Sequence, residues 1–194
     1  MKYIILMGGY AGCGKTYCGK RLSKNINAIY LDKDTLSRPL TELLLNNLED
    51  SEGPDDRHSD SYLKNVRPLE YKILLDTALE NTFNTATIVL NAPFITEFKS
   101  ENFIENLLDD LEDSCEEEVK IIKVWVNCSI DTMKKRIIER DAKRDYWKIK
   151  NWDKYSEKID ENVAQFNADY VIDNELDIPI EPQVEQIKEI ISEK

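Results

Sequence analysis

Eight consecutive residues carry the most specific chemistry in the chain. Gly9–Thr16 reads G-x-x-x-x-G-K-T, a pattern whose glycine-rich backbone turns its N–H groups around the phosphates of a nucleotide. Lys15 then reaches the terminal phosphates, the Thr16 hydroxyl is a ligand for Mg²⁺, and the following helix adds the positive end of its dipole. The pattern predicts a nucleoside triphosphate site formed by Gly9, Gly12, Cys13, Gly14, Lys15, Thr16 and Tyr17.

Two carboxylates follow the second apolar run, in Leu31-Asp32-Lys33-Asp34-Thr35. Asp32 can hold Mg²⁺ directly or through water, and Asp34 can accept the proton of an attacking hydroxyl. The alternative is that Asp34 caps a helix beginning at Thr35, while Asp32 lies in a solvated turn. Arg38 comes one helical turn after Asp34 and is either a contact for an anionic substrate group or an ordinary surface arginine.

The third apolar run ends in Asn91, at the place where an ATP-hydrolysing motor carries an acidic residue. This difference disfavours a motor, leaves the metal role to Asp32 and makes Asn91 a candidate contact for the substrate. Arg67 is a second substrate candidate, with pairing to Glu70 as its alternative. Pro68 is expected to kink or restart the helix in which Arg67 lies.

A basic segment stands out in an acidic chain. Residues 134–150 hold eight basic and three acidic residues, a local charge of +5, whereas the whole chain carries −12. Arg136, Arg140 and Arg144 are spaced i, i+4, i+8, which predicts one face of a helix. We expect a lid over residues 136–155 whose arginines clamp phosphate, and a solvated helix with acidic neighbours is the alternative. The nearby Trp147 and Trp152 are expected to pack inside the lid.

Two further segments hold residues that belong either to a binding site or to an ordinary loop. Asp173 and Asn174 follow the fifth apolar run, where adenine is expected to rest, and a plain turn is the alternative. A GTPase would need an Asn-Lys-x-Asp motif, which the sequence lacks. His58 lies in the irregular segment 49–60 and is expected to be a solvated loop histidine.

The elements that must position these residues alternate between strand and helix. Apolar runs predict strands at Tyr3–Met7, Ala28–Leu31, Ala86–Leu90, Lys120–Val126 and Asp169–Ile172. Helical patterns lie at Lys15–Lys24, Thr35–Asn46, Ser61–Thr82, Glu101–Leu111, Ile130–Arg144, Asp153–Phe166 and Val184–Ile191. Continuous apolar strands suit a parallel sheet covered on both faces, so we expect a three-layer α/β sandwich.

Composition narrows the function classes. A net charge of −12 argues against broad binding of nucleic acid or anionic membranes. Four cysteines without a C-x-x-C pair, beside a single histidine, disfavour zinc and a disulfide framework. The apolar core of the N-terminal run is too short for a signal sequence, and no run approaches a membrane span. We expect a single domain, residues 1–194, in the cytoplasm.

Several of these segments together resemble the small P-loop kinases of the nucleoside-monophosphate-kinase-like group. That group includes shikimate kinase, gluconate kinase, chloramphenicol phosphotransferase and the zeta toxins, and within it the match is to AAA-type ATP-binding kinases of unknown substrate. The resemblance implies a P-loop NTPase fold, a five-stranded parallel sheet in the order 2-3-1-4-5, a basic lid over ATP and Asp34 as catalytic base. It rests on Gly9–Thr16, residues 31–35, Arg67–Tyr71, Ala92–Phe94, the arginine helix and Ile172–Asn174.

The family's substrate signatures are missing. The Asp-Gly-Phe-Pro-Arg of adenylate kinase and the Asp-Arg-Tyr/His of thymidylate kinase do not occur, which disfavours nucleoside monophosphates as acceptors. The resemblance therefore implies transfer of the γ-phosphate of ATP, with Mg²⁺, to a hydroxyl of a small molecule. A toxin- or antibiotic-type kinase and a non-catalytic ATP-binding switch are the alternatives. The sequence leaves open the acceptor, the choice of ATP over GTP and the oligomeric state.

Overall fold

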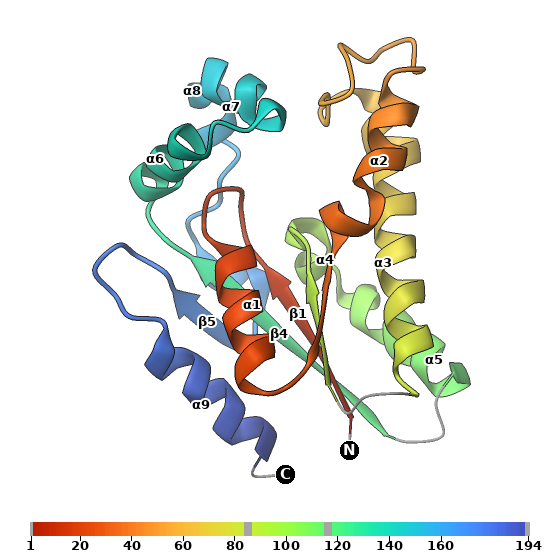
Figure 1. The fold of residues 1–194 in the computed structure, drawn as a ribbon, viewed down its shortest axis with the longest axis vertical. Helices are drawn as coiled ribbons and strands as arrows, with labels where there is room; N and C mark the ends of the chain where they lie inside the picture. Colours follow the sequence, from red (N-terminus) through yellow and green to blue (C-terminus); the bar gives the residue numbers. More distant parts are fainter. Residues whose placement is uncertain (1, 84–86, 115–117, 193–194) are drawn as a thin grey trace.

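A central parallel sheet organises the molecule. The computed structural model describes residues 2–83, 87–114 and 118–192, and its five strands lie in the order β2-β3-β1-β4-β5 (Figure 1). This confirms the expected order. The strands are β1 (Lys2–Gly8), β2 (Ile29–Asp32), β3 (Thr87–Asn91), β4 (Val119–Asn127) and β5 (Tyr170–Asp173). Ala86, expected to begin the third strand, lies outside the described residues.

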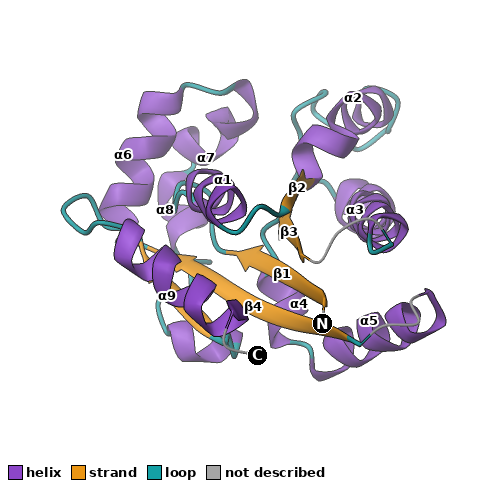
Figure 2. Ribbon diagram, turned by 60° about the horizontal axis from the view of Figure 1, so that its bottom comes forward, coloured by secondary structure: helices purple, strands orange, loops and turns teal. Residues whose placement is uncertain are grey.

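Helices cover both faces of the sheet, which confirms the three-layer arrangement. Helix α1 (Lys15–Asn25) packs beside α9 (Glu181–Ser192) on one face, while α4 (Ile95–Lys99) and α5 (Glu101–Ser114) lie on the other (Figure 2). Under α4 the core is aromatic, and the rings of Trp125 and Phe166 stack with centroids 3.6 Å apart. The side chains of Tyr3–Met7 in the central strand β1 are all buried, because helices cover both faces of the sheet.

Two helices beside the β2–β3 edge form what we call the α2–α3 arm, residues 33–81. Helix α2 spans Lys33–Leu45, and after the loop 46–61 a π-helical turn (Tyr62–Val66) leads into α3 (Arg67–Asn81). The expected single helix over 61–82 is thus divided, and Pro68 in the first turn of α3 confirms the predicted restart. The arm places the amino-terminal end of α2 beside the phosphate loop (Figure 1).

The helical segment that the sequence predicts as a lid is more broken than expected. Helix α6 (Ile130–Arg140) ends because Asp141 takes a left-handed conformation, with φ of 44°. A 3₁₀ turn (Lys143–Asp145), α7 (Tyr146–Lys150) and α8 (Trp152–Ser156) follow. The helix expected over 130–144 is therefore wrong beyond Arg140.

The helix expected over residues 153–166 is wrong beyond Ser156. Helix α8 ends at Ser156, and the chain then passes under the phosphate loop before a 3₁₀ turn at Val163–Phe166. The hydroxyl of Tyr10 accepts a hydrogen bond from the Asp160 backbone N–H at 2.9 Å, and the Asp160 carboxylate pairs with Lys99 at 2.8 Å. These contacts hold this segment out of a helix. Among the described helices, none is both long enough and apolar enough to span a membrane.

Candidate nucleotide and acceptor site

The phosphate loop is packed so closely that only glycine fits at its key positions. Gly14 has φ of +94°, and a Cβ added there would stand 2.0 Å from the side-chain nitrogen of Asn174. A Cβ on Gly9, with φ of +144°, would stand 2.5 Å from the Val126 carbonyl oxygen. Both backbone conformations are rare for residues with a side chain. The loop geometry thus depends on the glycines that the motif specifies.

Two neighbouring segments hold the loop, and a lysine of its own motif folds over it. The carbonyl oxygen of Cys13 accepts a hydrogen bond from Asn174 Nδ2 at 2.7 Å and one from Arg136 at 3.4 Å. The Lys15 ammonium donates to the Tyr10 carbonyl at 2.8 Å, so this lysine lies folded over the loop. Cys13 has a fully buried side chain, which makes it a small structural residue of the loop rather than an exposed thiol.

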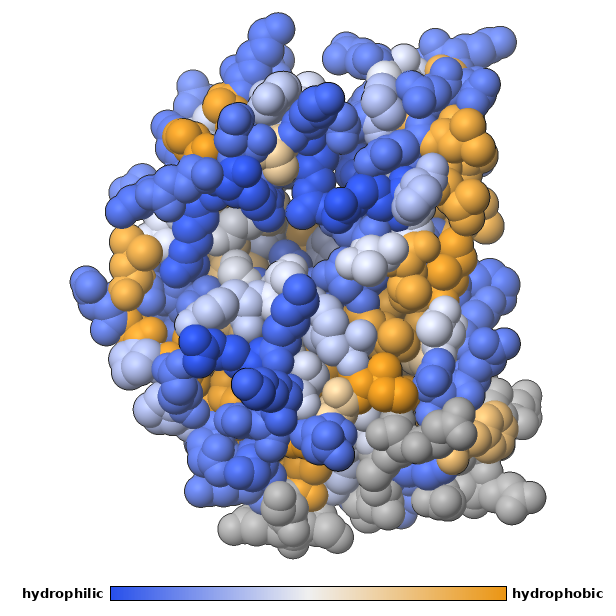
Figure 3. Space-filling model, viewed as in Figure 1, coloured by the Kyte–Doolittle hydropathy of each residue, from blue (hydrophilic) through white to orange (hydrophobic). Residues whose placement is uncertain are grey.

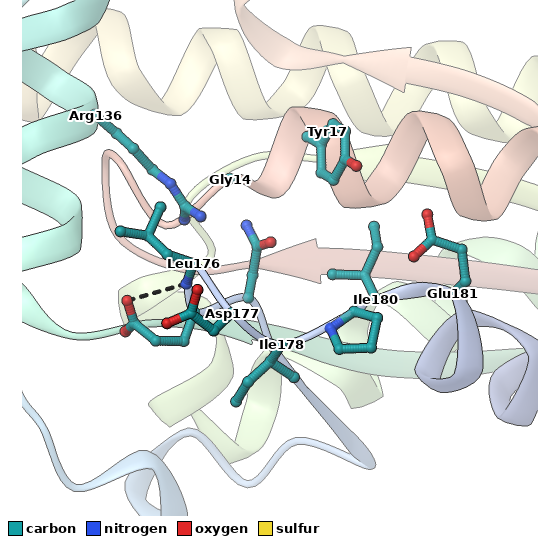
Figure 4. Close-up of a pocket in the computed structure, with 11 residues that line it drawn as sticks. Gly14, Tyr17, Arg136, Leu176, Asp177, Ile178, Ile180 and Glu181 are labelled. Carbon is teal, nitrogen blue, oxygen red and sulfur yellow. Dashed lines mark hydrogen bonds between the residues drawn. The ribbon is translucent and has the colours of Figure 1, made fainter.

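A pocket of about 630 Å³ opens beside the loop. Figure 4 shows its wall, which includes Arg136 from the lid, Tyr17 from α1 and apolar side chains from the segment after β5. Asn174 lines this pocket, but Asp173 does not. Asp173 ends β5, and its backbone N–H and carbonyl form hydrogen bonds with the side chain of Gln183 in α9. The sequence predicted Gly14, Tyr17, Arg136 and Asn174 as site residues, and it missed the rest of the wall, residues 175–181.

A cluster of oxygen atoms lies where β2 and β3 end beside the loop. Asp32 pairs with Asn91 in the sheet register, and its carboxylate accepts a hydrogen bond from Asn91 Nδ2 at 2.5 Å. The same amide nitrogen lies 3.4 Å from the Thr16 hydroxyl. Asn91 Oδ1 is buried and has no hydrogen-bond partner among the described residues. The carboxylate and the hydroxyl that this amide nitrogen contacts are oxygen ligands of the kind that suits a hard cation such as Mg²⁺.

Asp32, rather than Asp34, caps helix α2. Its carboxylate accepts a hydrogen bond from the Thr35 backbone N–H at 2.9 Å, and the helix begins at Lys33. The alternative in which Asp34 caps a helix from Thr35 is therefore wrong. Because the helix begins two residues earlier, Asp34 lies in its first turn and is free to face the lid.

Asp34 lies between two cations. Lys33 is 3.2 Å from one carboxylate oxygen, and Arg144 from the lid pairs with the other. Burial alone would raise the pKa of Asp34, but Lys33 and Arg144 outweigh it and hold the pKa well below its ordinary value. Asp34 is therefore ionised at neutral pH and touches both the arm and the lid.

The lid arginines do not share one helix face. Arg136 faces the phosphate loop, Arg140 pairs with the buried Asp145 at 2.5 Å, and Arg144 reaches Asp34. The expected common stripe is wrong, because α6 ends at Arg140 and Arg144 belongs to the 3₁₀ turn. Because the helix ends at Arg140, the three guanidinium groups lie in different parts of the site.

The two arginines of the arm lie in different surroundings. Arg67 pairs with Glu97 at 2.7 Å rather than with Glu70, and it lies over the Tyr71 ring at 4.5 Å. Arg38 is exposed on α2, and none of the ion pairs found in the described ranges includes it. Of these two, only Arg67 is held in a defined position.

His58 is not the solvated loop histidine that the sequence suggested. Its ring stacks on Trp147 of the lid, with centroids 3.9 Å apart and planes 30° apart. With the Asp34–Arg144 pair, this is a second contact between the arm side and the lid. Trp152 packs against the core as expected, whereas Trp147 reaches across to the loop 46–61. Figure 3 shows a notch between the lid and the arm with hydrophilic residues along both rims.

The His58 stack predicts a pH-dependent stability. Burial and the nearby Lys148 lower the pKa of His58 to about 4 from an ordinary value of 6.5. Between these values the unfolded chain binds the proton and the folded protein does not, so the free energy of unfolding falls as the pH falls. His58→Phe keeps a stacked ring without a titrating group. We expect its Tm to fall less than that of the wild type between pH 7 and pH 4.5, and equal slopes would contradict the assignment.

The glycine loop, the strand order and the lid define the fold of the small P-loop kinases. Residues 4–170 match a family model described as an AAA domain, and the chain belongs to that family. No curated protein matches the chain.

Solved structures show the same fold over nearly the whole chain. Shikimate kinase from Bacteroides thetaiotaomicron is 18% identical, with a TM-score of 0.56 and 98% of each chain covered. The Mycobacterium tuberculosis APS kinase CysC, in complex with AMPPNP and APS, is 14% identical with a TM-score of 0.57 and covers 98% of each chain. Chaetomium thermophilum Kti12, in complex with ADP-AlF3, is 14% identical with a TM-score of 0.61, covering 98% of this chain and 97% of its own.

Proposed function

We propose that the protein is an ATP- and Mg²⁺-dependent phosphotransferase that transfers the γ-phosphate to a hydroxyl of a small molecule. The observation that carries this proposal is the position of Asp34. Its ionised carboxylate lies in the first turn of α2, two residues after the Asp32 that contacts Asn91 near the Thr16 hydroxyl, and a lid arginine pairs with it. A phosphate-binding protein without an acceptor has no need of a carboxylate there.

The donor side is suited to ATP. Residues Gly9–Thr16 present backbone N–H groups and Lys15 to the phosphates, and the pocket beside them has Leu176, Ile178 and Pro179 in its wall. Apolar side chains of this kind suit the flat face of a purine base. We propose that adenine lies in this pocket against Asn174, with Arg136 near the phosphates.

The cluster at the ends of β2 and β3 supports the proposed metal. Thr16, Asp32 and the unpartnered Oδ1 of Asn91 would hold Mg²⁺ directly or through water. An Mg²⁺ ion held there would supply positive charge against the negative charge that develops on the phosphate oxygens during transfer. Asn91 is thereby better explained as part of the cation site than as a contact for the acceptor.

The chain's own residues account for the transfer. Asp34 accepts the proton of the acceptor hydroxyl while the hydroxyl oxygen bonds to the γ-phosphorus. The bond between the γ-phosphorus and the oxygen that bridges it to the β-phosphate breaks, and ADP is released. Lys15 and the lid arginines stabilise the charge on the transferring group. We propose that nucleotide phosphates compete with Asp34 for Arg144. The pKa of Asp34 would then rise toward its ordinary value, which makes the carboxylate a stronger base.

A small-molecule acceptor is favoured over a macromolecule. Two similar structures are named as kinases of shikimate and of APS, and the His58–Trp147 stack joins the lid to the loop that follows α2. The net charge of −12 opposes nucleic acid as the acceptor. A toxin- or antibiotic-type kinase is a special case of the same proposal and would use the same residues.

One observation favours a second candidate, a non-catalytic ATP-binding switch. Asn91 stands where an acidic residue would polarise water in an ATP-hydrolysing protein. A switch would bind ATP and release ADP slowly, whatever acceptor is present. It does not account for Asp34, because a switch needs no carboxylate facing the acceptor side.

A screen of hydroxyl-bearing small molecules for acceptor-dependent ADP release tests the proposal. We expect at least one acceptor to accelerate ADP release by wild-type protein with ATP and Mg²⁺, and no acceleration with Asp34→Asn. Release that no acceptor changes, over sugars, hydroxy acids, nucleosides and aminoglycosides, would contradict the proposal and favour the switch.

A further inference from the structure

A buried carboxylate lies at the centre of the α2–α3 arm, behind Asp34. Glu70 is only 2% exposed, and charge without partners at such a site would be strongly destabilising. Two cations and three hydroxyls satisfy it. The donors to its oxygens are Lys33 at 2.5 Å, Arg57 at 2.7 Å, Thr41 at 2.7 Å, Tyr62 at 2.8 Å and Ser37 at 3.2 Å.

Lys33 connects this buried cluster to the candidate base. Its side chain is 5% exposed, and its ammonium contacts Glu70 on one side and Asp34, at 3.2 Å, on the other. A lysine confined in this way has little rotamer freedom, so Asp34 meets a positive charge at a fixed place. The order Glu70–Lys33–Asp34 runs from the interior of the arm toward the lid.

We propose that Glu70 and Lys33 are positioning residues for the phosphoryl transfer: Glu70 fixes the ammonium of Lys33, and Lys33 fixes the carboxylate of Asp34 toward the acceptor. The inference rests on the proposed function in one respect, namely that Asp34 faces the acceptor hydroxyl. Neither Glu70 nor Lys33 touches the reacting atoms in this account.

The competing explanation is that the ion pair only joins α2 to α3. A structural role predicts that losing either partner weakens the arm and alters Asp34 in the same direction. A positioning role predicts that loss of Lys33 and loss of Glu70 change the ionisation of Asp34 in opposite directions. Loss of Lys33 removes a cation from Asp34, whereas loss of Glu70 leaves Lys33 with Asp34 as its remaining carboxylate partner.

The charges around Asp34 make this contrast measurable. Lys33 lies on its own helix, Arg144 comes from the lid and Arg57 from the loop 46–61, and all three lower its pKa. Asp32 is the nearby acidic group at the end of β2, where Tyr30 also lies. Removing Lys33 therefore leaves two arginines, and we expect the pKa of Asp34 to rise from its value in the wild type without reaching that of a free aspartate.

Titration of the Asp34 carboxyl carbon by NMR tests the proposal in the ligand-free protein. The protein is labelled with ¹³C at the aspartate carboxyl, and Asp34→Asn assigns the signal. The variants are Lys33→Met, Glu70→Gln and the double Lys33→Met/Glu70→Gln. Lys72→Met is the matched control, because that lysine pairs with Asp76 on the exposed side of α3.

The proposal predicts a specific pattern. In Lys33→Met and in the double variant, Asp34 should titrate at a higher pH than in the wild type. In Glu70→Gln and Lys72→Met, Asp34 should stay ionised down to the lowest pH at which the protein remains folded. If Lys33→Met fails to fold, the double variant carries the same prediction, because it leaves no unpaired charge from the Lys33–Glu70 contact. An unchanged titration without Lys33, or a rise of equal size in Glu70→Gln, would overturn the proposal.

This readout is separate from turnover. Transfer that survives in Asp34→Asn would refute the proposed function and leave the titration result standing. With an acceptor found by the screen, we also expect Glu70→Gln and Lys33→Met to lower kcat more than they raise the KM for ATP. A change confined to the KM for ATP would contradict the positioning role.

Discussion

Replacement of Asp34 by Asn is expected to lower the single-turnover rate of phosphoryl transfer by about 10²- to 10⁴-fold, the usual contribution of a positioned general base. The amide keeps the shape of the side chain but cannot accept the hydroxyl proton. It also loses the ion pairs to Lys33 and Arg144. The rate is measured by rapid quench with saturating ATP and an acceptor from the screen.

Binding of ATP should be nearly unchanged in that variant, because in the proposed function Asp34 faces the acceptor rather than the nucleotide. Isothermal titration with a non-hydrolysable ATP analogue measures this affinity. Asp60→Asn is the matched control, since Asp60 pairs with Lys64 at an exposed position of the arm. If transfer by Asp34→Asn equals that of the control, Asp34 is not the base.

Replacement of Lys15 by Met should weaken both nucleotide binding and transfer. The ammonium is the only charged donor within the glycine motif, and removing one preorganised donor from a developing charge typically costs about 10²–10³ in rate. The affinity for ATP falls as well, because the same group contacts the ground-state phosphates. Equilibrium titration with ATP and the rapid-quench assay give the two values.

Lys24→Met is the control for Lys15, because Lys24 lies exposed in the last turn of the same helix. The fold should survive in both variants, since Lys15 contacts only loop atoms of its own motif in this structure. Wild-type affinity for ATP in Lys15→Met would show that nucleotide does not bind at this loop.

The phosphate loop and the sheet could be predicted because their signals are local. Glycines with positive φ, a lysine and a threonine at fixed spacing define the loop by themselves, and apolar runs such as Tyr3–Met7 are typical of strands buried on both faces. The strand order came from the resemblance to the small P-loop kinases. Asp32 and Asp34 were placed near the site from their position after the second strand.

The contacts between distant segments were not predictable in the same way. The spacing of Arg136, Arg140 and Arg144 assumes a continuous helix, and a single left-handed residue, Asp141, ends it. His58 and Trp147 are far apart in the sequence and carry no pattern that links them. The pocket wall at residues 175–181 is a loop without periodicity, so only its place after β5 indicated a binding role.

The fate of the γ-phosphate tests the central claim most directly. Wild-type protein is incubated with ATP, Mg²⁺ and each acceptor that accelerates ADP release, and the products are followed by ³¹P NMR. We predict that phosphate appears as a monoester of the acceptor, in an amount equal to the ADP formed. Phosphate found only as the free inorganic ion with every acceptor would contradict the account and identify the protein as a slow ATP-hydrolysing switch.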